Sequence, residues 1–296
     1  MRVAFFGTPA ASVPALRALI ESQHSVEVVI TQPDRKRGRG RALSASPVKR
    51  AAIDLGLSVR TPERCSDVFD ELTSLRLDLG VVVAFGQLLP QSVLDAHRLG
   101  CINVHFSLLP RWRGAAPVER AILAGDVETG VAIMGMEASL DTGPIFAERR
   151  VTIGERTAGA LTDELVTLGA ELLIDTLARI ETIDPRPQRG EAVYADKLRP
   201  DEFRLHPTRP AVDLGRVVRA GNPRPGAWCS IDGTRIKVWR AEPVATGPRV
   251  GVIDRDAVLG TVDGGLRLLE VQPEGKPIME ATAWRNGRRG DVQIEA

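Results

Sequence analysis

The residue types best suited to chemistry lie in one short stretch of the chain, Asn103-Val-His-Phe-Ser-Leu-Leu-Pro110. Residues two apart in a strand share a face, so the side chains of Asn103 and His105 are expected to point the same way. An amide beside an imidazole can stabilise a carbonyl oxygen that becomes negative during acyl transfer, while the imidazole assists proton movement. A lone His is more often a packed core residue, but this pair, followed by a Pro-terminated loop, favours an oxyanion site.

A carboxylate that can serve the same site lies in the segment Ser139-Leu-Asp-Thr-Gly-Pro144. The Thr-Gly-Pro sequence after Asp141 predicts a turn, which can bring the carboxylate back to the end of a neighbouring strand. An Asp beside a His can orient the imidazole ring and take the proton that an attacking amine loses. An Asp before Thr-Gly is by itself more often a turn former, so this hypothesis depends on Asn103 and His105.

The elements that must position these residues alternate between strands and helices. Apolar runs and helical spacing predict, in order, strand 2–7, helix 12–22, strand 26–31, helix 47–55 with Ser46 as its N-cap, strand 79–85, strand 102–106, helix 116–123, strand 130–136 and helix 157–180. This alternation is typical of an α/β fold with a Rossmann-like, mostly parallel sheet and helices on both faces. Ligands of such sheets bind at the carboxyl ends of the strands.

The pattern of alternating strands and helices ends after residue 183. The proline-rich segment 184–190 begins a linker, and a short helix at 214–220 is followed by short apolar runs separated by turns. The runs predict a small C-terminal β-barrel (OB-like). We therefore expect a catalytic domain at 1–183, a linker at 184–203 and a barrel-like domain at 204–296.

Composition excludes several classes of protein. No window approaches the run of about 18 apolar residues that a membrane helix needs, so we expect a cytoplasmic protein without membrane contact. The three cysteines form no CxxC pair and the four histidines are scattered, so no metal site is indicated.

The first turn, Gly7-Thr-Pro-Ala10, lacks the G-x-G-x-x-G pattern of dinucleotide-binding folds. It is either a simple strand-to-helix turn or a ligand-facing loop.

A basic loop follows the second predicted strand. Segment 34–41 (Asp-Arg-Lys-Arg-Gly-Arg-Gly-Arg) carries five positive charges in a chain whose net charge is +1. Such a run is usually a solvated face, but a glycine-containing basic loop can also follow a phosphate backbone. The residues themselves leave both interpretations open.

Residues 103–117 (NxHxSLLPRWRGAAP) together with 139–143 (SLDTG) resemble the formyltransferases that use 10-formyltetrahydrofolate. The resemblance covers nearly the whole chain and is closest to members that act on methionyl-tRNA. It implies a catalytic trio of Asn103, His105 and Asp141. It also implies a folate site lined by Ser107, Leu108, Leu109 and Pro110, to which we add the loop residues Phe85, Gly86, Gln87 and Leu88. These residues end the segment 81–88, and the first half of that segment is equally consistent with a core strand that contacts no ligand.

The same resemblance implies the reaction and the partners. A formyl group would pass from 10-formyltetrahydrofolate to the amino group of initiator methionyl-tRNA by direct attack of the amine, without a metal. The family places a tRNA-contacting loop with a similar PDRxxGRG pattern where this chain has its basic loop, with Arg35, Arg39 and Arg41 as the expected contacts. The C-terminal domain would bind tRNA as well, and we expect a monomer.

Two alternatives stay open at this point. One is a folate-dependent formyltransferase that acts on a ribonucleotide or an amino sugar, and Pro144, where an acidic residue is often seen, is closer to those enzymes. The chain also has Leu205-His206 where family members commonly carry Asp-Trp. The other alternative is a catalytically silent tRNA-binding or folate-sensing protein of the same fold, against which the intact trio argues.

Removing the charges of Arg39 and Arg41 by alanine substitution is expected to weaken tRNA use and to flatten its salt dependence, because fewer counterions are released on binding. Folate affinity should stay unchanged. Fluorescence titrations of the variant with tRNA at two salt concentrations measure both effects. An unaltered salt dependence would contradict a phosphate contact at these residues.

Overall fold

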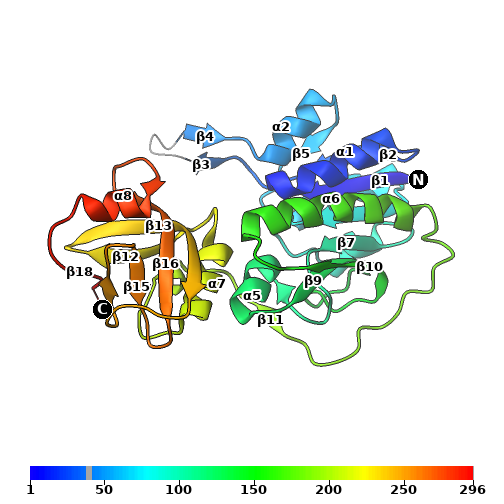
Figure 1. Ribbon diagram of the computed structural model, residues 1–296. Helices are drawn as coiled ribbons and strands as arrows, with labels where there is room; N and C mark the ends of the chain where they lie inside the picture. Colours follow the sequence, from blue (N-terminus) through cyan, green and yellow to red (C-terminus); the bar gives the residue numbers. More distant parts are fainter. Residues whose placement is uncertain (38–41, 296) are drawn as a thin grey trace. The chain divides into compact units, whose positions relative to one another are not determined.

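The computed structural model describes residues 1–37 and 42–295, and the chain divides into two compact units, which we describe separately (Figure 1). The first unit consists of Met1–Gly114, Thr129–Val151 and Thr162–Tyr194. The second consists of Ala115–Glu128, Thr152–Leu161 and Ala195–Ala296. Two short segments that precede residue 162 thus group with the C-terminal part of the chain, which no sequence pattern indicated. The boundaries 1–183, 184–203 and 204–296 stay a prediction.

The first unit is built on a seven-stranded sheet. From one edge to the other its strands are β10 (Ile145–Thr152), β9 (Glu128–Gly135), β7 (Cys101–His105), β6 (Leu79–Val83), β1 (Arg2–Gly7), β2 (Ser25–Ile30) and β5 (Val59–Arg60). The strands from β7 to β5 are parallel, and β9 runs antiparallel to β7. From β1 the chain moves outward to β2 and β5, then continues on the other side of β1 with β6 and β7. A topological switch point therefore lies between β1 and β6.

Helices cover both faces of this sheet, which confirms the predicted α/β class. The helices with residues in the first unit are α1 (Val13–Glu21), α2 (Pro47–Asp54), α3 (Phe69–Leu75), α4 (Gln91–Asp95) and α6 (Ala158–Leu177), with the 3-10 turns η1 (Ala10–Ser12) and η2 (Cys65–Val68). Ser46 caps α2 as predicted, since its Oγ accepts a hydrogen bond from Lys49 N at 2.9 Å. The unit also contains β8 (Arg113–Gly114) and the hairpin strands β3 (Arg35–Arg37) and β4 (Ala42–Ser44).

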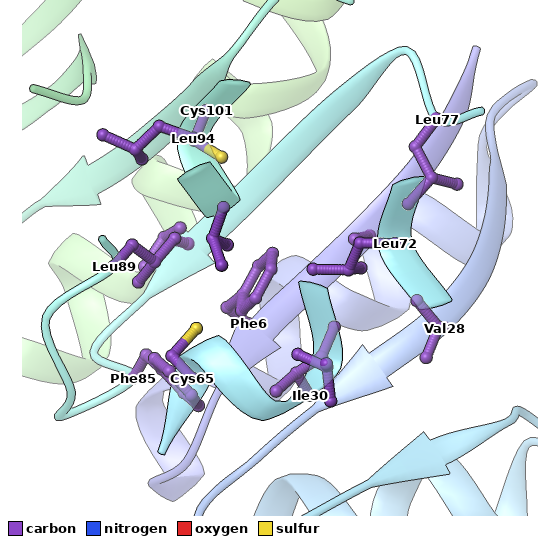
Figure 2. Packing of buried hydrophobic residues seen from close by; sticks show 14 residues of the cluster. Phe6, Val28, Ile30, Cys65, Leu72, Leu77, Phe85, Leu89, Leu94 and Cys101 are labelled. Atoms are coloured by element: carbon purple, nitrogen blue, oxygen red, sulfur yellow. The ribbon is translucent and has the colours of Figure 1, made fainter. Parts of the chain in front are cut away.

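Alternating side chains of the strands define the two faces. Phe6 of β1 lies in an apolar cluster with side chains from β2, η2, α3 and α4 (Figure 2). Its ring meets that of Phe85 edge-on, with centroids 5.6 Å apart. On the opposite face α6 approaches β7 so closely that a Cβ at Gly169 would lie 2.9 Å from Val104 Cγ1. Residues 103 and 105, one step from Val104, therefore face away from α6, in the row begun by Cys101 of the Phe6 cluster.

The second unit contains an antiparallel sheet that curls. Its strands run β12 (Ala227–Ile231), β13 (Thr234–Val244), β16 (Gly265–Pro273), β15 (Val258–Gly260), β14 (Val252–Ile253) and β18 (Val292–Gln293), with β17 (Met279–Glu280) paired to β16. Glu295 N donates to Ser230 O at 2.8 Å, so the chain just after β18 meets β12 at the other end of the strand order. This curling agrees with the predicted barrel-like domain.

Three helices accompany this sheet. They are α5 (Pro117–Ala124), α7 (Ala211–Gly221) and α8 (Ala281–Asn286), together with the turn η3 (Pro200–Phe203), and the short strand β11 is Tyr194–Ala195. Helix α5 packs on α7, and α7 packs on β13. Segment 115–128 therefore belongs to the second unit through an apolar helix contact.

Phe6→Ala is expected to lower the free energy of unfolding by about 3–5 kcal/mol, because it removes a fully buried ring from the centre of the cluster in Figure 2. Chemical denaturation measures the loss. Leu43→Ala serves as the control, since the Leu43 side chain is 71% exposed and should change stability little. A loss for Phe6→Ala no larger than that of the control would contradict the packing described.

Candidate active site

Strand β7 ends at the carboxyl edge of the parallel strands, and its two polar residues are His105, its last residue, and Asn103, two residues earlier. Asn103 is half-buried and lies opposite Val82 of β6 and Met134 of β9. His105 is the last residue of β7 and is only 5% exposed. Both face the side of the sheet away from α6, as the spacing of the sequence predicts. The strand thus presents an amide and an imidazole in one row.

The hydrogen bonds of His105 define which ring nitrogen carries a hydrogen. Its Nε2 lies 2.9 Å from the backbone oxygen of Trp112. A carbonyl oxygen only accepts hydrogen bonds, so Nε2 must be the donor. The other nitrogen, Nδ1, lies 3.7 Å from Asp141 Oδ2. Nδ1 is therefore the atom that gains a proton when the ring becomes cationic, and a carboxylate faces it.

Two residues with left-handed backbones bring these groups together. Trp112 has φ 64° and Asp141 has φ 52°, values that non-glycine residues adopt rarely and that cluster at functional sites. Asp tolerates this conformation better than most residues. The carboxylate Oδ2 of Asp141 also accepts a hydrogen bond from Gly114 N at 2.8 Å, which holds it beside His105. The structure thus brings Asp141 beside His105, and Asn103 lies two residues before His105 in β7, while the catalytic roles of the three residues stay a prediction.

The turn that carries Asp141 is held by a residue that the sequence analysis missed. Gln188 Nε2 donates to the backbone oxygens of Asp141 at 2.9 Å and Gly143 at 2.8 Å. Its Oε1 accepts from the guanidinium of Arg113 at 3.1 and 2.7 Å. Gln188 lies in the proline-rich segment that was interpreted as a linker, and nothing in its local sequence indicates this role.

The loop after β7 lies against the same part of the sheet. Ser107 is fully buried and donates to Arg111 O at 2.6 Å, and Leu109 packs in an apolar cluster with Met134 and Ile145. Leu108 and Pro110 are half-buried. Among the four residues expected to line a folate site, these two leave surface available, whereas Ser107 and Leu109 shape the loop from inside.

The loop after β6 leaves the sheet beside the loop after β7, because the two strands are neighbours. Phe85 is 2% exposed and belongs to the core cluster, and Gly86 has φ 85°. Gln87 Nε2 donates to the backbone oxygens of Pro62 and Glu63 at 3.2 and 3.3 Å. Leu88 is 75% exposed. Core packing therefore accounts for Phe85, and Leu88 is an apolar side chain open to a ligand.

The basic hairpin is described only in part. Arg35 begins β3, is exposed, and donates to Gln32 Oε1 at 3.0 Å. Arg39 and Arg41 lie outside the described residues. Of the three expected tRNA contacts, the structure therefore describes Arg35 alone.

Neither cysteine of the first unit is suited to be a nucleophile. Burial raises the pKa of the Cys65 thiol to about 11 and raises that of the Cys101 thiol as well. A nucleophilic cysteine needs a thiolate near neutral pH, so both are packed thiols.

Within residues 1–37 and 42–295, no three His, Cys, Asp or Glu side chains gather as metal ligands would. No helix of the described chain has the length and apolar character to cross a membrane.

Comparisons with known proteins give a consistent result. Residues 1–177 match the family described as formyl transferase, and residues 197–289 match the formyl transferase C-terminal domain. The methionyl-tRNA formyltransferase of Paracoccus denitrificans (strain Pd 1222) is 50% identical over 285 residues, which cover 95% of each chain. That of Thermobifida fusca (strain YX) is 46% identical over 301 residues, which cover 98% of this chain and 97% of the relative.

Solved structures share the fold at lower identity. HypX from Aquifex aeolicus, in complex with tetrahydrofolic acid, superposes with a TM-score of 0.67 at 17% identity, over 100% of this chain and 51% of that one.

Gln188→Ala is expected to loosen the turn at residues 139–144, because two backbone carbonyls lose their donor. Hydrogen–deuterium exchange of that segment should become faster, while exchange in β1 stays unchanged.

Gln188→Glu is the matched variant. It retains an acceptor for Arg113 but loses the donor, so it should loosen the turn at least as much. Wild-type exchange in Gln188→Glu would show that the side chain acts through Arg113 alone.

Proposed function

Since the chain belongs to the formyl transferase family, we propose that it transfers a formyl group from 10-formyltetrahydrofolate to the amino group of methionyl-initiator tRNA. The observation that carries the assignment of the site is the 3.7 Å approach of His105 Nδ1 to Asp141 Oδ2, beside Asn103 on the same strand end. Hydrogen-bond donors near a developing oxyanion and a nearby proton acceptor both speed acyl transfer.

The reaction is a direct attack of the amine on the formyl carbon. A bond forms between the amino nitrogen and that carbon, and the carbonyl oxygen becomes negative in a tetrahedral intermediate. The bond from the formyl carbon to N10 of the folate then breaks. The amine gives up one proton and N10 takes one, so the products are the formylated amine and tetrahydrofolate. No covalent bond to the enzyme is needed, which accords with the neutral, buried thiols of Cys65 and Cys101.

We assign the oxyanion to Asn103 and His105, and the handling of the amine proton to Asp141. The amide of Asn103 donates to the oxyanion, and His105 donates from Nδ1 once that atom is protonated. Asp141 orients the ring, because its carboxylate lies on the Nδ1 side. The chemistry requires no metal ion, since these side chains provide the groups that offset the developing charge.

The nature of the acceptor is supported by the relatives and by charge. The relatives that match over nearly the full length, at 43–50% identity, are methionyl-tRNA formyltransferases. Arg35 at the base of a basic hairpin suits a phosphate backbone. The tetrahydrofolate in HypX supports a folate donor at this fold. The folate would lie along Leu108, Pro110 and Leu88, whose side chains leave surface available beside the trio.

The test of this function is transfer of labelled formyl from 10-formyltetrahydrofolate to charged initiator tRNA, with free methionine and glycinamide ribonucleotide as competing acceptors. Transfer to the tRNA alone is expected. Transfer to a small amine with none to the tRNA would assign the chain to formyltransferases that act on small molecules. Binding of tRNA without transfer would indicate a silent protein of the same fold.

His105→Ala and Asp141→Ala are expected to lower turnover by roughly two to four orders of magnitude, because both groups act mainly in the transition state. Folate affinity should change little by comparison, whereas Asp141→Ala should also lower the unfolding midpoint, because it loses the bond from Gly114 N and places Ala at a positive φ. Steady-state kinetics and chemical denaturation measure these quantities. A loss of less than tenfold in both variants would contradict the assigned roles.

The variant Asp141→Asn tests the negative charge of this residue separately from its structural role. Asn tolerates the left-handed backbone and keeps an oxygen for Gly114 N, but it carries no negative charge. The variant should fold like the wild type and still turn over slowly. Wild-type turnover in Asp141→Asn would show that the carboxylate charge is dispensable.

A further inference from the structure

Three consecutive residues of the loop after β7 support the predicted trio. Trp112 O accepts a hydrogen bond from His105 Nε2 at 2.9 Å, and Gly114 N donates one to Asp141 Oδ2 at 2.8 Å. Arg113 lies between them in the sequence, so contacts with the trio hold the backbone on both sides of it. The half-buried side chain of Arg113 makes a third contact.

That third contact is with the amide of Gln188. Arg113 Nε and Nη2 donate to Gln188 Oε1 at 3.1 and 2.7 Å. Gln188 Nε2 in turn donates to Asp141 O at 2.9 Å and to Gly143 O at 2.8 Å. Asp141 is therefore held at its carboxylate by a backbone amide and at its carbonyl by Gln188.

The guanidinium determines which way round this amide lies. The two carbonyls of the turn can only accept, so the NH₂ group of Gln188 must face them. Its oxygen must then face a donor, and Arg113 provides two N–H groups. Because this donor is charged, it forms strong hydrogen bonds and polarises the amide, which strengthens the bonds that the NH₂ group donates. Loss of the guanidinium therefore weakens the hold on Asp141.

The charge of Arg113 is not used in an ion pair. In the part of the chain that the structure describes, residues 1–37 and 42–295, no carboxylate lies within ion-pair distance of its guanidinium. A half-buried cation beside a neutral amide costs desolvation energy that no opposite charge offsets. The guanidinium therefore adds little to stability, which favours a functional reason for its position.

The backbone on both sides of Gln188 is also fixed. Arg186 exchanges two backbone hydrogen bonds, at 2.8 and 3.0 Å, with the first residue of β10. On the other side, Val193 O accepts a hydrogen bond from Arg113 N at 2.9 Å. The segment 186–193 therefore ties the turn of Asp141 to the loop after β7, and the side chain of Gln188 contacts both.

The distance between His105 and Asp141 shows why this hold matters. Nδ1 and Oδ2 are 3.7 Å apart. A hydrogen bond between them needs about 2.7–3.2 Å, so a movement of about 0.5 Å decides whether it forms. While the carbonyl of Asp141 is fixed, rotation of the carboxylate can close the gap. A loose turn would let the whole residue move away.

We propose that Arg113 is a positioning residue of the transfer reaction and that it acts on Asp141 through Gln188. The guanidinium fixes the amide, the amide fixes the carbonyl, and the carboxylate stays within reach of His105. The inference rests on the proposed function and adds to it a residue that contacts neither the folate nor the amine.

The test compares transfer of labelled formyl to charged initiator tRNA by the full-length wild type and by five variants. These are Arg113→Met, Arg113→Lys, Gln188→Ala, the double variant Arg113→Met/Gln188→Ala, and Arg17→Ala. Methionine keeps the apolar stem of arginine but has no donor. Arg17 is an exposed residue of α1, so Arg17→Ala is the control for loss of a positive charge. Chemical denaturation checks that each variant is folded.

Arg113→Met should lower kcat roughly 10- to 100-fold, as expected when a catalytic group is displaced, while KM for tRNA changes less than about twofold. Arg113→Lys should recover part of the loss, because the ammonium group still provides a donor. Arg17→Ala should behave like the wild type. The double variant should be no slower than Gln188→Ala, because both substitutions interrupt the same chain of contacts. Arg113→Lys takes the place of Arg113→Met in this cycle if the latter does not fold.

Losses that multiply in the double variant would overturn the inference, because Arg113 would then act independently of Gln188. A raised KM for tRNA with unchanged kcat would overturn it in favour of a phosphate contact. A wild type without transfer to tRNA would instead remove the proposed function. Hydrogen–deuterium exchange at residues 139–144 would then decide the positioning of Asp141. Faster exchange in Arg113→Met, with no further increase in the double variant over Gln188→Ala, would support it, and wild-type exchange in Arg113→Met would overturn it.

Discussion

The hydrogen bond from His105 Nε2 to the carbonyl of Trp112 fixes the chemistry that the site can perform. Because a carbonyl cannot donate, the bond leaves Nδ1 as the variable position of the ring, and that atom faces Asp141. The left-handed backbone of Trp112 belongs to the same loop that orients this carbonyl. A rigid backbone acceptor thus fixes the tautomer, and the carboxylate of Asp141 faces the other nitrogen.

The sheet explains why these groups meet. Parallel strands end at one edge, so loops after β1, β2, β6 and β7 gather there although they are distant in sequence. Helix α6 fills the face behind Val104, which leaves the row of Asn103 and His105 for the site. Strand β7 carries the amide and the imidazole, and hydrogen bonds from Gly114 and Gln188, which are distant in sequence, hold the segment that carries the carboxylate.

Much of this arrangement follows from local sequence patterns. The central strands, the cap at Ser46 and the shared face of Asn103 and His105 are set by periodicity and capping, which act over a few residues. Strand β10 and the clamp by Gln188 were missed, because both depend on partners far along the chain. Core burial of Phe85 and Leu109 also depends on tertiary packing, so a motif alone cannot separate lining residues from core residues. The roles of the trio and the domain boundaries stay predictions.

Gln188, whose side chain hydrogen-bonds to the turn of Asp141, is synthesised 47 residues after Asp141. The trio is complete in the sequence once residue 141 has left the ribosome, yet the two carbonyls of its turn obtain their donor only when residue 188 emerges. A nascent chain that already holds the first parallel strands therefore lacks the last constraint on its carboxylate. The turn of the predicted catalytic centre can gain this constraint only after most of the first unit has been translated.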